Sequence, residues 1–299
     1  MILWHTSRTM TSPSNTAQIT QDSLKMAQTH YENFPVASVF LPRRLRVPIA
    51  MIYRFARQAD DFADEGSDTI EERLNNLQKF RDELNLIQAY IQPNTDFFRA
   101  LQHTIRDHQL PLQPFYDLLD AFSQDVVKTR YENFDEVMDY CKRSANPIGH
   151  LLLHLYQAAT PHHLVLSDAI CSALQLINFY QDIAIDFAKN ADKSRIYLCQ
   201  DEMKKANITE LDIAQQVVDT KWQHFMLLNI TRAEQLLLAG KPLGRILTGR
   251  IGLELRLIIA GGERILHKLK ACKGDIFHYR PQLNSWDWVI ILLKALFKR

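Results

Sequence analysis

The chain has 299 residues, of which 46% are hydrophobic, so it can form one large domain or two around a sizeable core. Its formal net charge is +1 and it carries no basic stripe interleaved with aromatic residues, which argues against nucleic acid as a partner. The four cysteines lie far apart and form no CxxC pair, which argues against a zinc site or a disulfide framework and favours a cytoplasmic location.

The pattern of predicted elements indicates an all-α fold. Residues 1–20 have no periodicity and lack the apolar run of a signal peptide, so we predict a disordered leader there. From Gln21 onward the pattern is helical, with neither a convincing set of alternating strands nor a glycine-rich phosphate loop. Nothing marks a domain boundary, so we predict one helical domain over residues 21–283 and a C-terminal amphipathic helix at 284–299.

The first candidate site lies at the end of a helix predicted over about residues 47–65. In its stretch RFARQADDFADE, Asp60 and Asp64 stand one turn apart on the same face, with Asp61 beside them and Arg57 one turn upstream. For one such cluster alone, carboxylates that face solvent are the more common explanation.

The segment Tyr140–Gly149, YCKRSANPIG, is the next informative stretch. It combines small and polar residues, among them Ser144 and Asn146, with Pro147 in a helical region. Proline bends a helix and frees backbone carbonyls, which in a bundle often opens room for a ligand. Small residues suit close helix packing equally well, so the residues alone leave both interpretations open.

A second polar face follows in the stretch LQLINFYQDIAID at 174–186. Asn178, Asp182 and Asp186 recur every four residues, while most positions around them are apolar. An unpaired buried carboxylate costs several kcal/mol, on the order of the penalties for buried charges. An amide oxygen and two carboxylates are suitable ligands for a hard divalent cation such as Mg²⁺.

Two acidic helices can face each other across a cavity in a helical bundle. Opposed carboxylates repel unless cations lie between them, and nearby arginines indicate an anionic group as well. Together these features predict a bound diphosphate. The polar segment 187–197 that follows is either a solvated run of charges or a lid that brings Arg195 onto phosphate oxygens.

The C-terminal stretch WDWVIILLKALFKR, residues 286–299, has an apolar core too short to span a bilayer. Two tryptophans, a run of Leu and Ile and a basic end suit a helix that lies in a membrane interface. A last helix docked on the bundle explains the same pattern, and both alternatives stay open.

These motifs resemble those of the squalene/phytoene synthases, the trans-isoprenyl diphosphate synthases of head-to-head terpene coupling. The resemblance covers roughly residues 25–282 and rests on five stretches in the expected order: HYENF at 30–34, RQADDFAD at 57–64, YCKRSANPIG at 140–149, NFYQDIAID at 178–186 and RIYL at 195–198. It implies an isoprenoid-synthase helical bundle with a central cavity.

The resemblance also implies roles for individual residues. Asp60, Asp64, Asn178, Asp182 and Asp186 are expected to be the Mg²⁺ ligands, and the four aspartates with Arg57 are expected to be catalytic. The expected substrate-binding residues are Tyr31, Asn33, Phe34, Asp61, Tyr140, Ser144, Asn146, Gly149, Gln181, Arg195 and Tyr197, with Phe34 and Tyr140 lining the hydrocarbon channel.

Within the family, the chain looks most like the hopanoid-pathway branch that makes hydroxysqualene from presqualene diphosphate. Many relatives have Arg where this chain has Gln181, and Ser144 and Asn146 are polar where relatives often have small apolar residues. A member that quenches its cation with water needs polar groups to position that water, whereas one that reduces it needs NADPH. The resemblance therefore implies a Mg²⁺-dependent lyase that needs no NADPH.

Three alternatives remain. The nearest is head-to-head condensation of two farnesyl or geranylgeranyl diphosphates to presqualene diphosphate, squalene or phytoene, a transferase activity. The HYENF and RSANPIG stretches argue against a terpene cyclase or a chain-elongating prenyltransferase. A non-enzymatic assembly factor would have lost its carboxylates, which this chain keeps. A cytoplasmic protein with peripheral contact to the inner face of the membrane, through its C-terminus, fits either enzymatic alternative.

Overall fold

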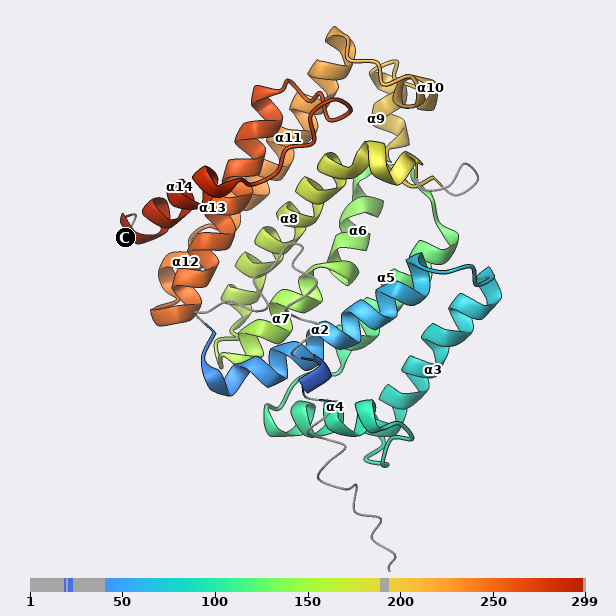
Figure 1. Cartoon of the computed structure of the whole chain (residues 1–299), viewed down its shortest axis with the longest axis vertical. Coiled ribbons are helices and arrows are strands. Elements are labelled where there is room, and N and C mark those ends of the chain that lie inside the picture. Colours follow the sequence, from blue (N-terminus) through green and yellow to red (C-terminus); the bar gives the residue numbers. More distant parts are fainter. Residues whose placement is uncertain (1–18, 20, 24–40, 189–193, 298–299) are drawn as a thin grey trace, which may run out of the picture.

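The computed structural model describes residues 19, 21–23, 41–188 and 194–297. Most of them lie in helices, so the predicted all-α fold is confirmed (Figure 1). The predicted leader lies almost entirely outside the described residues, as do Tyr31, Asn33 and Phe34, whose roles stay predictions.

The described chain forms a helical bundle with one pair of short strands. Its elements are α2 (Arg43–Asp64), α3 (Ile70–Gln88), α4 (Asp96–Asp107), α5 (Gln113–Val127), β1 (Arg130–Tyr131), α6 (Phe134–Ser144), α7 (Asn146–Leu155), α8 (Pro161–Ala188), β2 (Ile196–Cys199), α9 (Gln200–Lys205), α10 (Glu210–Ala214), α11 (Thr220–Gly240), α12 (Leu243–Ile246), α13 (Gly249–Ala271) and α14 (Ser285–Phe297).

Two hydrophobic cores share the bundle, one on each side of its middle. The first packs α2–α5 around Phe55, whose ring meets those of Phe98 and Phe115 edge to face at 6.1 and 5.1 Å. The second core surrounds α8, which runs between α6 and α11 in Figure 1. This core includes the fully buried Trp222 of α11. Because α2 belongs to the first core and α8 to the second, the two acidic helices border the seam between the cores.

Local sequence explains where α2 ends. Thr69 begins α3 with a capping box: its hydroxyl accepts from the Glu72 amide, while the Glu72 carboxylate accepts from the Thr69 amide at 2.8 Å. Gly66, in the preceding turn, has a φ of 79°, which glycine adopts without strain. The turn therefore stops α2 directly after Asp64, at the end of its acidic face.

The predicted bend at Pro147 is a complete break between helices. α6 ends at Ser144 and α7 begins at Asn146, which puts Pro147 in the first turn of α7, where its missing amide costs nothing. A Cβ at Gly149 would lie 2.3 Å from the Ser167 hydroxyl, so glycine allows α7 and α8 to approach closely. Close packing and a pocket wall, the two alternatives for this segment, both apply.

The parallel strands β1 and β2 were not expected from the sequence. They are too short to show a period of two, and they are paired between residues 130–131 and 196–199. Their pairing fixes the chain that follows α8 beside the chain that follows α5. It thereby brings Arg195 and Tyr197 next to the end of α5.

The C-terminal helix α14 docks on α13 through a narrow face. Asp287, Ile291 and Ala295, four residues apart, are buried against a cluster that includes Leu257 and Ala260. The outward face is apolar, with these exposed residues: Trp286, Trp288, Val289, Ile290, Leu292, Leu293 and Leu296. In the described part of the chain, no helix combines the length and apolar character that crossing a bilayer requires.

Candidate active site

A cavity of about 320 Å³ lies in the seam between the two cores, with walls from α2, α7, α8 and α13. One end is polar and is formed by Arg57 and Asp60 of α2 and by Gln175 and Asn178 of α8. Most of the remaining wall is apolar, including Ile52, Leu152, Leu153, Ile170, Leu255 and Ile258. A volume of this size is typical of pockets for small organic ligands.

On the α2 side of the polar end, one arginine holds several carboxylates. The guanidinium of Arg57 lies 2.8 Å from Asp61, 2.6 Å from Glu65 and 3.7 Å from Asp60. Asp60 and Asp61 lie three and four residues after Arg57 on one face of α2, and Glu65 is the residue that follows the helix. Arg57 therefore lies at the polar end of the cavity with its charge already shared among carboxylates.

A second arginine connects this helix to the chain after α8. Arg195 forms an ion pair with Asp64 and lies 3.8 Å from the buried Asp125 of α5. Asp125 also accepts hydrogen bonds from the hydroxyls of Tyr140 at 2.5 Å and Tyr197 at 3.4 Å. Arg195 and Asp64 are 131 residues apart in sequence, so only the fold brings them together.

The acids on this side outnumber their cations, and two of them are perturbed. Although 39% of the Asp60 side chain is accessible, protein surrounds it on most sides, and this burial, together with Asp64, raises its pKa to about 7. Burial likewise raises the pKa of Asp125 to about 7, against the opposing effects of Arg195 and of the Tyr140 hydrogen bond. The site thus carries unneutralised negative potential, which favours a bound cation.

The α8 side is arranged differently. Asn178 reaches the cavity wall, and Asp182, one turn further, accepts from Arg280 at 2.7 Å. Gln181 donates to the carbonyl of Pro281 at 2.5 Å, which ties the chain around Arg280 to α8. Arg280 comes from the segment between α13 and α14, so this side is also completed by a residue distant in sequence.

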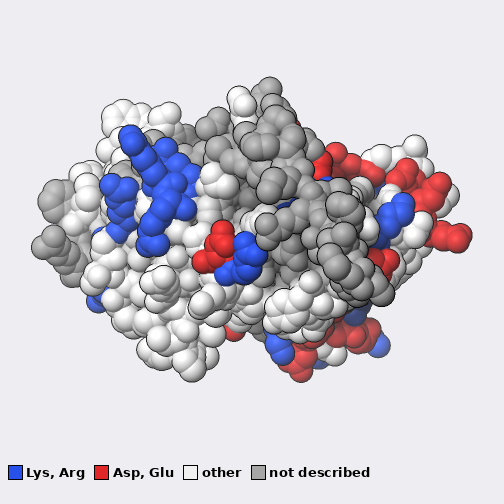
Figure 2. All heavy atoms as spheres, turned by 90° about the horizontal axis from the view of Figure 1, so that it is seen from below, with Lys and Arg blue, Asp and Glu red and all other residues white. Residues whose placement is uncertain are grey.

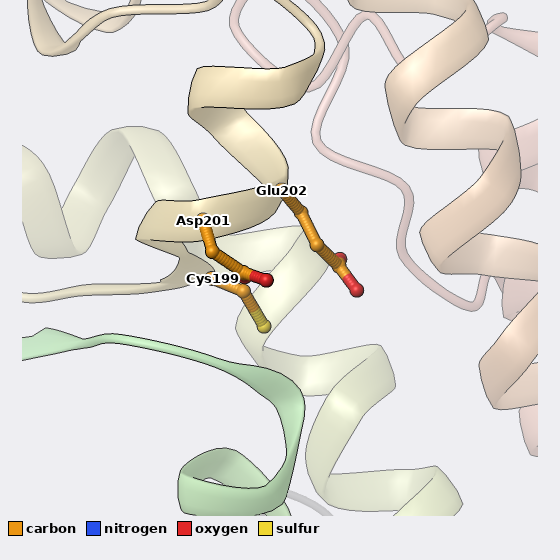
Figure 3. A group of neighbouring side chains, drawn as sticks. All are labelled: Cys199, Asp201 and Glu202. Atoms are coloured by element: carbon orange, nitrogen blue, oxygen red, sulfur yellow. The ribbon is translucent and has the colours of Figure 1, made fainter.

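The donor set fits Mg²⁺, which prefers carboxylate and amide oxygens. Asp60, Asp64, Asn178 and Asp182 supply such oxygens from two helices. Within the described residues, His, Cys, Asp and Glu ligand atoms gather within 4.8 Å in one group of three, Cys199, Asp201 and Glu202 (Figure 3). The carboxylates of the polar end do not form such a group of three among the described residues.

Ion pairs account for two of the three residues in Figure 3. Glu202 pairs with Arg232 at 2.6 Å and Asp201 with Lys205 at 2.8 Å. Burial raises the pKa of the Cys199 thiol to about 12, so it is not a thiolate ligand at neutral pH. We therefore assign a structural role, and not a metal-binding role, to these three residues.

The structure places the other predicted residues as follows. Gly149 lines the cavity, whereas Tyr140, Ser144, Asn146 and Gln181 do not belong to its described wall. The Ser144 hydroxyl is buried without a hydrogen-bond partner among the described residues, and Asn146 accepts from Ser172 at 3.0 Å. Asp186 lies in the last turns of α8, partly exposed.

Four residues of the site were missed in the sequence. Gln175 could have been found, because it precedes Asn178 by three residues and so continues the polar face of α8. Tyr53 likewise precedes Arg57 by one turn and lines the cavity. Asp125 and Arg280 carry no local signal, since their partners come from other helices.

Comparison with known proteins agrees with this geometry. Residues 27–287 match the squalene/phytoene synthase family. The hydroxysqualene synthase of Rhodopseudomonas palustris is 34% identical over 275 residues, 91% of each chain, and that of Sinorhizobium fredii is 35% identical over 249 residues, 80% of each chain. The crystal structure of squalene synthase HpnC from Alicyclobacillus acidocaldarius aligns with a TM-score of 0.78 at 32% identity, over 87% of this chain and 96% of that one.

The helical bundle, whose apolar cavity ends at Arg57 and Asp60 of α2 and at Asn178 of α8, has the fold of the all-α isoprenoid synthases. The chain belongs to the squalene/phytoene synthase family, as the resemblance of its motifs predicted. It is accordingly an enzyme of isoprenoid biosynthesis that processes a prenyl diphosphate.

Proposed function

We propose that the protein converts presqualene diphosphate and water to hydroxysqualene and diphosphate, with Mg²⁺ as its cofactor and without NADPH. The observation that supports this proposal most is the cavity. Its apolar wall ends at Arg57 and Asp60 of α2 and at Asn178 of α8, and the ion pair of Asp182 with Arg280 lies one turn beyond Asn178. The names of the R. palustris and S. fredii relatives support this product over others of the family.

The polar end would hold the diphosphate. Asp60 and Asp64 from α2, and Asn178, Asp182 and Asp186 from α8, would hold Mg²⁺, which neutralises charge on the leaving group. Arg57, Arg195 and Arg280 already lie beside these carboxylates, within reach of the same anion. Stabilisation of developing charge is commonly the largest contribution of an active site to the rate.

The chemistry then takes place against the apolar wall. The carbon–oxygen bond to diphosphate breaks, and the cyclopropylcarbinyl cation rearranges where Ile, Leu and Phe side chains exclude bulk water. One water adds to the rearranged cation, its oxygen forms the alcohol, and its proton leaves with the diphosphate. No covalent bond to the protein is needed.

The water must be positioned by polar groups, for which Ser144, Asn146 and Gln181 remain our candidates, although none of the three is part of the described cavity wall. A lone water needs about 2–4 polar partners. The buried hydroxyl of Ser144, which has no partner among the described residues, is available for one such bond. Ser144→Ala should divert the cation to elimination products. Ser123→Ala is the matched control, because the Ser123 hydroxyl donates to the Leu119 carbonyl within α5.

Incubation of the purified protein with presqualene diphosphate and Mg²⁺ tests the proposal. Hydroxysqualene is the expected product, and added NADPH should yield no squalene. If the protein instead makes a C30 or C40 product from farnesyl or geranylgeranyl diphosphate and leaves presqualene diphosphate unchanged, the head-to-head condensation is its function. The similarity to HpnC, which is described as a squalene synthase, is the reason for including the condensation in the test.

We also propose that the outward face of α14 contacts an anionic membrane surface. Apart from Ser285 and Lys294, its exposed described residues are apolar, whereas its buried acid, Asp287, faces inward. Arg256 bonds the carbonyl of Ala295 in α14 and that of Gly244 in α12, so the end of α14 lies beside α12.

A basic cluster adjoins this apolar face. Figure 2 shows Lys and Arg gathered at the end of the molecule where α12 and the start of α2 lie. Exposed arginines of these segments and of the neighbouring start of α13 are Arg43, Arg44, Arg46, Arg245 and Arg250. Apolar side chains beside clustered arginines are the combination that binds anionic lipid surfaces.

Vesicle co-sedimentation tests this contact without disturbing the docked face. Serine at both Val289 and Leu293 should reduce binding to vesicles that contain phosphatidylglycerol, because apolar area is lost. Serine at both Leu227 and Leu238, which are similarly exposed on α11, is the matched control. Equal sedimentation of the two variants would show that α14 is a structural helix only.

A further inference from the structure

The C-terminal end of α2 carries acidic residues at a place where a helix favours basic ones. The carbonyl end of a helix bears partial negative charge, so cations stabilise its last turn and carboxylates do not. α2 has no basic residue in its last turn, which holds Asp61 and Asp64. This helix end therefore needs a compensating positive charge from another element.

Arg73 of α3 supplies that charge to the backbone of α2. Its guanidinium donates to the carbonyls of Phe62, at 3.4 Å, and of Ala63, which both belong to the last turn of the helix. It also donates to the carbonyls of Gly66 at 2.9 Å and Asp68 at 3.0 Å, in the turn that follows. Because the last carbonyls of a helix have no partner within it, Arg73 completes the end of α2.

Arg73 differs in its surroundings from the arginines of the polar end of the cavity. Arg57 and Arg195 pair with the carboxylates themselves. Only 9% of Arg73 is exposed, and within the described residues its guanidinium bonds to backbone carbonyls and to no carboxylate. Arg73 thus compensates the helix end and leaves the carboxylate oxygens available for a metal ion.

The position of Arg73 is set by α3. The capping box at Thr69 fixes the start of this helix, and Arg73 follows four residues later, next to the turn that joins α2 to α3. A guanidinium carries five N–H donors in one rigid plane, so it can hold several carbonyls at once, which a lysine ammonium does not reproduce. The end of α2 is therefore tied to α3 by one side chain.

We propose that Arg73 is a positioning residue for the metal site, because it holds the turn of α2 on which Asp60 and Asp64 stand. The two aspartates lie four residues apart, so they share a face only while the turn between them stays helical. The inference rests on the proposed function only in taking these aspartates as metal ligands. It makes no assumption about the product.

Binding of Mn²⁺, a paramagnetic substitute for Mg²⁺, tests the proposal without substrate and can be measured by electron paramagnetic resonance. Arg73→Lys keeps the charge but loses most of the hydrogen bonds, and Arg73→Met loses both. Each should weaken Mn²⁺ binding by about tenfold or more, as is typical when a residue that orients metal ligands is removed. Hydrogen exchange of the Glu65 amide, which donates to the Asp61 carbonyl, should become faster in both variants.

Two further variants serve as controls. Arg99 of α4 likewise donates to backbone carbonyls, those of Pro93 at 2.9 Å and Asn94 at 2.7 Å, in the loop between α3 and α4. Arg99→Met should therefore keep the wild-type affinity for Mn²⁺, even where its Tm falls. Asp60→Asn removes a proposed ligand and shows how much of the measured binding belongs to the site.

Three outcomes would overturn the proposal. Tighter binding in Arg73→Met with unchanged binding in Arg73→Lys would mean that Arg73 acts on the metal only through its charge. Wild-type binding in both variants with a lower Tm would leave Arg73 a purely structural residue, and Arg73→Lys alone decides this if Arg73→Met does not fold. Wild-type binding in Asp60→Asn would reject the metal ligands of the proposed function, and the role of Arg73 with them.

Discussion

Two places in this molecule set aspartates among basic residues on helices, with opposite results. Between α13 and α14, the fully buried Asp287 accepts from Arg264 at 2.6 Å, from Lys268 and from the Asn284 amide at 2.8 Å. Burial alone would raise its pKa, but these hydrogen bonds outweigh burial and hold the pKa well below its usual range. One acid thus meets two cations, and its charge is fully compensated.

At the polar end of the cavity, which we also call its mouth, acidic side chains outnumber basic ones. Arg57 serves three acidic side chains, and Arg195 serves Asp64 and Asp125. The pKa values of Asp60 and Asp125 rise to about 7 as a result of burial and neighbouring carboxylates. An acid whose charge is compensated, such as Asp287, stabilises a contact between helices. An excess of acids over basic residues, as around Arg57 and Arg195, indicates a cation-binding site.

The largest effect should come from removing acids at the mouth. Asp60→Asn and Asp182→Asn should each lower turnover by about 100-fold or more, because charge stabilisation of the leaving group is lost. Steady-state kinetics at limiting Mg²⁺, with circular dichroism as a check on folding, measures this. Wild-type turnover in both variants would mean that these aspartates do not hold the metal.

The compensated acid should behave in the opposite way. Asp287→Ala leaves Arg264 and Lys268 without their partner and should destabilise the docking of α14 by about 3–5 kcal/mol. Hydrogen exchange of α14 amides should rise sharply, while kcat on dispersed substrate stays near the wild-type value. Unchanged exchange in α14 would contradict the role assigned to Asp287.

A substitution at the buried Asp125 tests whether this acid positions Arg195. Asp125→Asn keeps the shape but weakens the hold on Arg195 and on Tyr140, so turnover should fall by about tenfold. Asp117→Asn on the same helix, whose carboxylate accepts only from Gln113 in the described structure, is the control. Equal kinetics of the two variants would remove Asp125 from the site.

The raised pKa of Asp60 predicts how Mg²⁺ binding depends on pH. Below about pH 7 its carboxyl is protonated, and the proton must leave before the oxygen can bind metal. The apparent affinity for Mg²⁺ should therefore fall by about tenfold from pH 8 to pH 6, as expected for one group of pKa near 7. Calorimetry in buffers of different ionisation enthalpy should detect proton release, and its absence at pH 6 would argue against Asp60 as a ligand.

The smallest effect concerns stability without metal. A carboxyl whose folded pKa is raised costs stability as pH rises from its unfolded value, about 3.9, through its folded value. Asp60→Asn should thus raise Tm slightly at neutral pH in the presence of a chelator, and the gain should vanish near pH 4. A lower Tm at neutral pH would mean that the aspartate is compensated, as Asp287 is.

The sequence by itself determined the helices and the two acidic faces. Period and capping are properties of neighbouring residues, so α2, α8 and an irregularity at Pro147 could be predicted from them, although the predicted bend is a complete break. The spacing of Asp60 with Asp64, and of Asn178 with Asp182, is fixed within a single helix. The family resemblance followed from the same local motifs.

Only the tertiary structure determined the interaction partners of the charged side chains. Arg195 reaches Asp64, and Arg280 reaches Asp182, across 131 and 98 residues, and no local pattern encodes such pairs. The same holds for Glu254, which accepts from Tyr156 across 98 residues and which the sequence alone would leave as an ordinary charged position of a helix. Packing determines which charges are buried and what surrounds them. The pKa of an acid and the cost of its charge follow from these surroundings.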